Sequence, residues 1–215
     1  MATNNLESIA NASEWSANLD VEMPIRERDI PGFEKWINWN SYNPNLDRDG
    51  EMIHNGYDFA AYYNSQGECV LGLPAETVVR AIADGVASIS TCAHPEEQVR
   101  DFYRTMILKH NDAGLASGYA HIIPLVEEGQ IVKKGDPILK LYKSPGSEWG
   151  RIVHLHFYLG KIPFDGLPNV NDLIECVDPC SVFGQFSCLD ANPQNAQIFE
   201  VPQLQTTRRV IAHFR

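Results

Sequence analysis

The stretch RIVHLHFYLG, residues 151–160, is apolar and rich in β-branched and aromatic residues. Such a run is typical of a β-strand, in which residues two apart point to the same face. His154 and His156 are therefore predicted to lie side by side on one face. Leu155 and Phe157 are predicted to point the other way, into the core.

Short apolar runs punctuated by glycine continue back from this stretch to residue 52. Several short strands separated by turn signals favour a mainly β fold, an antiparallel sheet or sandwich with one or two short helices. HPEEQVRDFY (94–103) predicts one inserted helix, because its proline is followed by two glutamates and then apolar spacing. IPGFEKWINW (30–39) predicts a short helix or a docking segment. The turn formers of SYNPNLDRDG (41–50) predict a surface loop.

The chain divides into a central domain and two extensions. Residues 1–49 are expected to form an N-terminal arm, of which residues 1–22 are polar and loosely attached. Residues 50–183 hold the domain. Residues 184–215 form a C-terminal extension that could supply one or two strands.

The composition excludes several classes of protein. Of the 215 residues, 44% are hydrophobic and 21% charged, and the formal net charge is −11. With no block of like charges, we expect no nucleic-acid partner. No apolar run reaches the length of a transmembrane helix, so no transmembrane segment is expected. The N-terminus lacks the basic and apolar regions of a signal peptide as it stands.

Five cysteines are an odd number, and three of them cluster in ECVDPCSVFGQFSC. Their spacing matches no zinc ribbon, and no histidine is near. We expect a disulfide with one thiol left over, and reduced structural cysteines remain an alternative. The cysteines are Cys69, Cys92, Cys176, Cys180 and Cys188.

The pentapeptide HNGYD holds two potential metal ligands. In an extended segment His54 and Asp58 share a face, and Gly56 leaves room between them. A structural alternative is that Asp58 caps a turn while His54 is exposed. His156 could add a third ligand from another strand. Two imidazoles and one carboxylate are the ligand set of a catalytic zinc whose fourth position is open.

His154, and His121 in GYAH, would then lie near the metal without binding it. Such histidines suit hydrolysis, since one can take the proton of the attacking water and the other can steady the oxyanion of a tetrahedral intermediate. Imidazoles titrate close to neutral pH, which makes them usable in these roles.

Five motifs in this order resemble the M23, or LytM/lysostaphin-type, zinc metallopeptidases. The resemblance covers roughly residues 50–180, and ordered motifs are far more specific together than any one alone. The motifs are HNGYD (54–58), TVVRAIADGVAS (77–88), GYAH (118–121), GQIVKKGD (129–136) and HLHF (154–157).

The resemblance implies zinc bound by His54, Asp58 and His156, with His121 and His154 as the catalytic pair. It implies a barrel-sandwich hybrid-like LytM fold and hydrolysis of peptide bonds in the stems or cross-bridges of bacterial peptidoglycan. A location in the cell envelope or outside the cell would follow. Some members of the family have lost ligands and regulate other hydrolases, so a catalytically silent zinc-binding module is the alternative.

Some features depart from the family pattern. PILKLYKSPGSEWG (137–150) lacks the glycines that usually follow the Lys-Lys-Gly turn, so the loop before HLHF is expected to be remodelled. The insert at 94–103 replaces a tighter turn, and a pI of about 5.0 is unusual for an enzyme acting on anionic walls. GQIVKKGDPILKL also resembles the hairpin of biotinyl carrier domains, but Lys133 and Lys134 lack the flanking methionine of a modified lysine.

The N-terminal arm suggests self-inhibition. It contains Trp15, Trp36 and Trp39, and an arm of this length could fold over the metal. If it does, removing residues 1–40 should raise activity.

Overall fold

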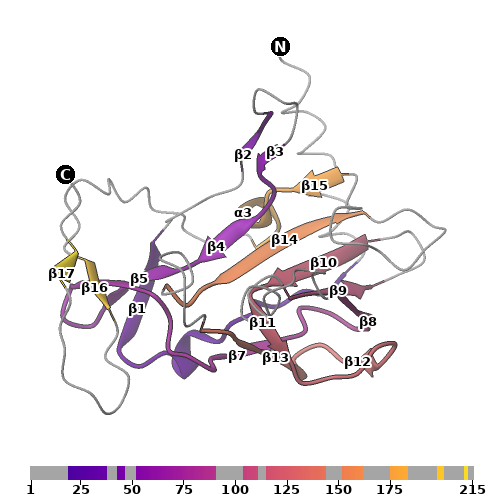
Figure 1. Ribbon diagram of the computed structural model, residues 1–215, viewed down its shortest axis with the longest axis horizontal. Coiled ribbons are helices and arrows are strands. Elements are labelled where there is room, and N and C mark those ends of the chain that lie inside the picture. Colours follow the sequence, from indigo (N-terminus) through magenta and orange to yellow (C-terminus); the bar gives the residue numbers. More distant parts are fainter. Residues whose placement is uncertain are drawn as a thin grey trace, which may run out of the picture.

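The computed structural model consists mostly of antiparallel β-sheet and contains very little helix (Figure 1). It describes residues 19–37, 43–46, 52–90, 104–110, 115–143, 152–161, 175–183, 198–200 and 211–212. Among these residues no sheet closes into a barrel. The mainly β fold expected from the sequence is confirmed.

The largest sheet has seven strands and carries the candidate site. Six strands follow one another in the order β12, β8, β9, β10, β14 and β15. The seventh, β4, also pairs with β14. All of its pairs are antiparallel. The strands are β4 (Tyr57–Phe59), β8 (Gly85–Ser90), β9 (Thr105–Lys109), β10 (Leu115–Ala120), β12 (Ile131–Val132), β14 (Leu155–Lys161) and β15 (Glu175–Val177).

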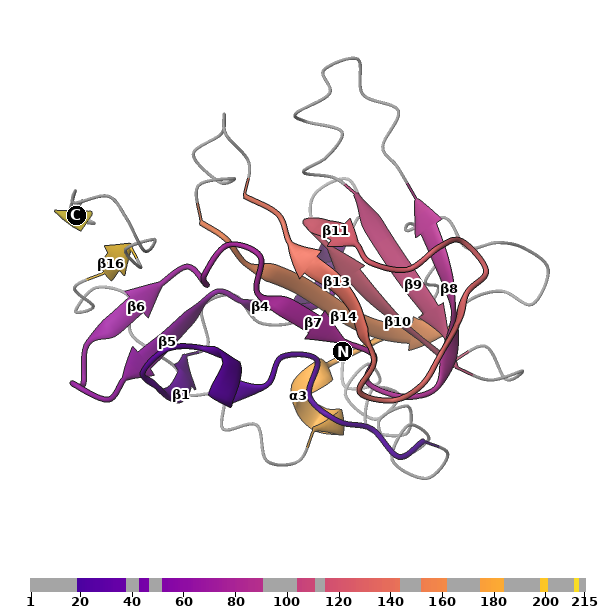
Figure 2. The ribbon, with the colours of Figure 1, turned by 90° about the horizontal axis from the view of Figure 1, so that it is seen from below.

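A three-stranded sheet covers one face of the large sheet. It consists of β7 (Val78–Arg80), β11 (Ile122–Pro124) and β13 (Pro137–Leu141), in the order β11, β13, β7. Figure 2 shows these strands lying across β10 and β14. Side chains from both layers join one buried cluster, including Val79 and Leu139 from the small sheet. The core is therefore a sandwich between the two sheets.

The alternation of β14 decides which face carries the histidines. Leu155, Phe157 and Leu159 are fully buried in the core cluster. His156 lies between them in sequence and is only partly buried, so it points to the opposite face. The predicted core positions of Leu155 and Phe157 are confirmed. Truncating a side chain as buried as Phe157 costs about 3–5 kcal/mol, which indicates how firmly β14 is held.

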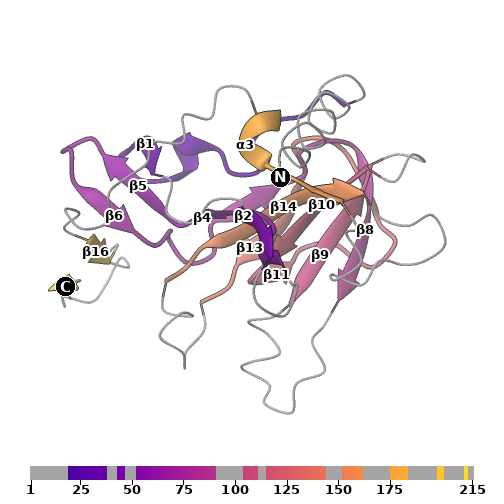
Figure 3. The ribbon, with the colours of Figure 1, turned by 90° about the horizontal axis from the view of Figure 1, so that it is seen from above.

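A third sheet lies at one end of the molecule (Figure 3). Its order is β1, β5, β6, β16, β17, and only the β6–β16 pair is parallel. The strands are β1 (Phe33–Ile37), β5 (Ala61–Asn64), β6 (Cys69–Leu71), β16 (Ile198–Glu200) and β17 (Ile211–Ala212). The C-terminal extension thus contributes two short strands.

The prediction of a helix at 30–39 is wrong, because residues 33–37 form β1. Trp36 and Ile37 pair with Tyr62 and Ala61 of β5, and both are buried. Trp36 also stacks edge-on against Phe59, with ring centroids 5.1 Å apart. Cross-strand burial of these side chains outweighs the local helix signal.

Other local predictions have mixed outcomes. The loop expected at 41–50 contains a strand, β2 (Asn43–Leu46), which pairs with β3 (Met52–His54). The described helices are a 3₁₀ turn, η1 (Glu27–Asp29), and α3 (Pro179–Val182), which Asp178 caps through the amide of Cys180. The helix expected at 94–103 lies outside the described residues.

Residues 19–37 are part of the folded unit. Ile25 and Ile30 are almost fully buried in the main core cluster, and Leu19 and Val21 pack against it. The loose attachment expected for residues 1–22 is therefore wrong for residues 19–22. Deleting residues 1–40 would remove Trp36 and these core side chains, so that deletion would test folding before it tested self-inhibition.

The described cysteines include both oxidation states. Cys180 is disulfide-bonded, whereas Cys69 and Cys176 are buried thiols. Burial raises the pKa of the Cys176 thiol to about 11. No helix in the described part of the chain is long and apolar enough to span a membrane.

Candidate metal centre

A tight bend brings the two ends of HNGYD together. His54 ends β3, Asn55 and Gly56 form the bend, and Asp58 lies in β4. A Cβ atom on Gly56 would lie 2.3 Å from the carbonyl oxygen of Phe157. Only glycine therefore allows the bend to approach β14 this closely. The two potential ligands converge because the chain turns between them, rather than because it is fully extended.

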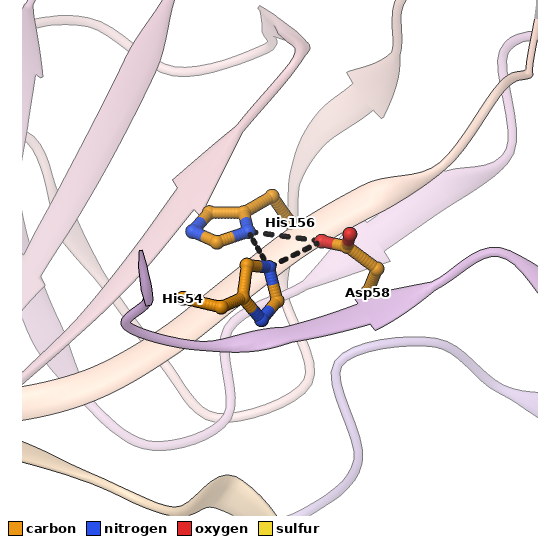
Figure 4. Close-up of side chains that lie close together, drawn as sticks. All are labelled: His54, Asp58 and His156. Carbon is orange, nitrogen blue, oxygen red and sulfur yellow. Dashed lines mark hydrogen bonds and ion pairs between the residues drawn. The ribbon is translucent and has the colours of Figure 1, made fainter. Parts of the chain in front are cut away.

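Three ligand atoms from three elements meet at this point (Figure 4). His156 Nδ1 lies 2.9 Å from Asp58 Oδ1 and 3.1 Å from His54 Nε2. His54 Nε2 lies 3.3 Å from Asp58 Oδ1. Their side chains are only 12–16% exposed. The three residues together could hold a metal ion.

The three separations are slightly shorter than those between the ligand atoms of a tetrahedral metal site. In tetrahedral zinc with bonds of ~2.1 Å, neighbouring ligand atoms are roughly 3.4 Å apart, and the observed separations are 2.9, 3.1 and 3.3 Å. Lone pairs on three such atoms repel one another unless a proton or a cation lies between them. The arrangement can therefore hold either a shared proton or a metal cation, and among the described residues three side chains converge as potential ligands.

Electrostatics keeps Asp58 ionised. Burial raises its pKa, but hydrogen bonds and charge interactions with His156 and His54 outweigh burial and hold the pKa well below its ordinary value. A carboxylate rather than a carboxylic acid therefore faces the two imidazoles at neutral pH, as a metal site requires.

A second pair of histidines stands beside the three ligands. The rings of His121 and His154 have centroids 4.6 Å apart, and His121 lies 6.3 Å from the ring of His156. His121 follows β10 and precedes β11, at the point where the chain leaves the large sheet for the small one. Its φ of +64° is left-handed, a conformation that costs an L-residue on the order of 1 kcal/mol. Strained backbone of this kind is common at functional sites.

The local environment of His154 fixes its chemical form. Its Nδ1 lies 2.8 Å from the carbonyl oxygen of Ile152, to which the N–H donates. Burial lowers the pKa of His154, with the charge of Asp58 opposing this effect. A neutral ring with the proton on Nδ1 leaves a lone pair on Nε2, which can accept a proton.

The structure brings all five of the residues singled out in the sequence into one cluster, on the face of β14 away from the core. His54, Asp58 and His156 converge, and His121 and His154 lie next to them. The structure does not test their roles as ligands and catalytic groups, which remain predictions. Sequence reasoning gave no role to Asn55, whose Oδ1 lies 2.9 Å from His156 Nε2. The only signal for it is an amide directly after a potential ligand.

Comparison with solved structures finds matches at low identity and with TM-scores below 0.5. The catalytic domain of the antimicrobial peptidase lysostaphin from Staphylococcus simulans is 21% identical, with a TM-score of 0.47 over 76% of this chain and 99% of that chain. A mutant catalytic domain of the prophage-encoded M23 protein EnpA from Enterococcus faecalis is 20% identical, with a TM-score of 0.43 over 71% and 95% of the two chains. LytU is 20% identical, with a TM-score of 0.48 over 72% and 89%.

No curated protein matches this chain at a significant level. The family model described as Peptidase family M23 matches residues 52–166, which is more than half of the chain. The matched span contains all five clustered residues. The protein therefore belongs to peptidase family M23.

Proposed function

We propose that this protein is a zinc-dependent endopeptidase that hydrolyses peptide bonds in the stems or cross-bridges of bacterial peptidoglycan. The observation that carries the proposal is the convergence of three ligand atoms beside a pair of histidines that do not join them. Family membership supports a peptidase, and the proposed substrate extends that support to cell-wall peptides. The proposed location is accordingly the cell envelope or the exterior of the cell.

His54, Asp58 and His156 would hold the zinc ion. When bound, zinc supplies Lewis acidity that polarises the scissile carbonyl and makes water acidic enough to attack at neutral pH. The single carboxylate leaves the site with a net positive charge, which favours a developing oxyanion.

His154 is the proposed general base. Its Nδ1–H donates to the carbonyl of Ile152, so Nε2 carries the lone pair that accepts a proton from the attacking water. Burial lowers its pKa, which keeps the ring neutral and ready to act at neutral pH. The same hydrogen bond stops the ring from turning away from the cluster.

His121 is proposed to stabilise the oxyanion or to protonate the leaving amine. Its ring packs against that of His154 with centroids 4.6 Å apart, so both can reach one substrate carbonyl. The left-handed backbone conformation of His121, at the junction of the large and small sheets, sets the direction of its side chain. The roles of His121 and His154 could be exchanged without changing the reaction.

The test is release of new amino groups from purified peptidoglycan. Wild type is compared with His156→Ala, His154→Ala and a chelator-treated sample, with bound zinc measured in each. His156→Ala should lose zinc and activity together, whereas His154→Ala should keep zinc and lose at least 100-fold in rate. Mass spectrometry of the products would name the bond.

Wild type that binds one zinc but cleaves no wall or cross-bridge peptide would overturn the peptidase proposal. The catalytically silent zinc-binding module would then be the better description. Wild type that cleaves after complete zinc removal would overturn the role of the metal.

A further inference from the structure

Asn55 contacts the potential ligand on the opposite strand. It lies in the bend between β3 and β4, directly after His54. Its Oδ1 is 2.9 Å from Nε2 of His156, 101 residues away in the sequence. Asn55, which follows the potential ligand His54 in the sequence, therefore contacts a second potential ligand, His156.

This contact places an acceptor at Nε2 of His156 and leaves Nδ1 for the converging group. An amide oxygen only accepts hydrogen bonds, so the imidazole nitrogen facing it must carry a hydrogen. A neutral imidazole has one N–H, so a ring that gives the lone pair of Nδ1 to a metal ion has its hydrogen on Nε2, where Asn55 accepts it. Nδ1 is the atom that faces Asp58 and His54, at 2.9 and 3.1 Å. The hydrogen bond therefore presents the nitrogen that a metal ion would need.

We propose that Asn55 is a positioning residue whose amide oxygen accepts a hydrogen bond from Nε2 of His156 and holds the ring with Nδ1 turned toward Asp58 and His54, the orientation that metal binding needs. This inference rests on the proposed function, because it concerns the same metal centre. Asn55 Oδ1 faces Nε2 of His156, whereas the converging group is built on Nδ1 of the same ring. Hydrogen bonds to the far nitrogen of a ligating histidine typically change metal affinity about 10- to 100-fold when they are removed.

The close packing of the bend explains how so short a side chain reaches His156. Gly56 lies against the backbone of Phe157, next to His156, where a Cβ atom would not fit. Asn55 is partly buried, and the side chain of His156 is 16% exposed. Water therefore competes poorly for this hydrogen bond.

The experiment measures zinc affinity of metal-free full-length protein by competition with a chromophoric chelator. Asn55→Ala removes the acceptor and should weaken zinc binding about 10- to 100-fold. Asn55→Asp keeps an acceptor in the same place and should bind zinc at least as tightly as wild type. Asn64→Ala is the matched control, because the side-chain hydrogen bonds recorded for Asn64 are to Gln66 and Glu68 in the adjoining turn. It should leave zinc affinity unchanged.

Two results would overturn the inference. One is an Asn55→Ala variant that matches wild type in zinc affinity. The other is an Asn55→Asp variant that loses as much affinity as Asn55→Ala, which would point to packing alone. If wild type itself binds no zinc, the proposed function fails as well, so the two failures are distinguishable.

Discussion

His156 and Asp58 are direct partners across the antiparallel β4–β14 pair, with Nδ1 and Oδ1 2.9 Å apart. The pairing places both side chains on the face away from the core, because Leu155 and Phe157 fill the core face of β14. A slip of one residue would turn His156 inward and bury a polar ring among apolar side chains. Core packing therefore sets the register on which the metal centre depends.

Metal removal should lower stability as well as activity. A ligand that binds only the folded state stabilises it by ~4 kcal/mol at 1,000 times its dissociation constant. We expect zinc to raise the free energy of unfolding of wild type by about that amount, measured by chemical denaturation with and without chelator. The variant His156→Ala should show no such difference, and an equal difference in that variant would place the zinc elsewhere.

Gly56→Ala should damage both the fold and the site. The added methyl would lie 2.3 Å from the Phe157 carbonyl oxygen, which is backbone and cannot rotate away. We expect a loss of about 3 kcal/mol in unfolding free energy and weaker zinc binding.

Gly129→Ala is the matched control for Gly56→Ala. Gly129 has a φ of +74° and nothing within 4 Å of an added Cβ, so only backbone strain of about 1 kcal/mol is expected. Equal losses of unfolding free energy in the two variants would show that β14 leaves room for a methyl group at position 56.

Tyr158→Phe should leave stability unchanged or raise it by about 1 kcal/mol. Tyr158 is 1% exposed, and its hydroxyl has no hydrogen-bond partner among the described residues. Removing a buried hydroxyl that makes no bond removes its desolvation cost. Thermal and chemical denaturation would measure the change.

Tyr57→Phe should destabilise the protein, in contrast to Tyr158→Phe. The Tyr57 hydroxyl is buried and donates to the carbonyl of Ile37, 3.1 Å away. Its loss should lower stability by about 1 kcal/mol. If Tyr158→Phe destabilised the protein as much as Tyr57→Phe, an unidentified partner would bind the Tyr158 hydroxyl.

His110 should make stability depend on pH. Its Nδ1–H donates to the carbonyl of Asp84, and Nε2 lies 2.8 Å from the buried Ser117 hydroxyl. Burial lowers the pKa of His110 from 6.5 to about 4. Between these values the unfolded chain takes up a proton that the folded protein does not, so stability falls as pH falls. The contribution is complete above pH 6.5 and is lost toward pH 4.

The measurement compares wild type with His110→Gln in metal-free form. The stability of wild type should fall on the order of 2 kcal/mol more than that of the variant between pH 6.5 and 4. Ser117→Ala retains His110 and should keep a pH dependence close to that of wild type. Parallel pH profiles for wild type and His110→Gln would contradict the prediction.

Local sequence patterns were sufficient for the β class of the fold and for the candidate residues of the site. The alternation of RIVHLHFYLG predicts the inward Leu155 and Phe157 and the outward His156, because side chains alternate along any strand. HNGYD and GYAH supply residue types whose chemistry suits a metal and proton transfer. Spacing within a few residues is enough for such predictions.

Where the local signal and the tertiary contacts disagreed, the contacts decided. The spacing of residues 30–39 favoured a helix, but pairing with β5 and burial of Trp36 made a strand. Residues 19–22 looked like a loose arm, yet Leu19 and Val21 pack on the core. Burial against distant partners carries more free energy than local propensity.

The sequence by itself determined the alternation of the strands and the chemistry of the five clustered residues. Only the tertiary structure decided that His156 meets Asp58 98 residues away and Asn55 101 residues away. The same packing determined which nitrogen of each ring faces the others. The reason is physical: spacing fixes the face of a strand, but distances between strands depend on register, on the close approach at Gly56, and on the core that holds both in place.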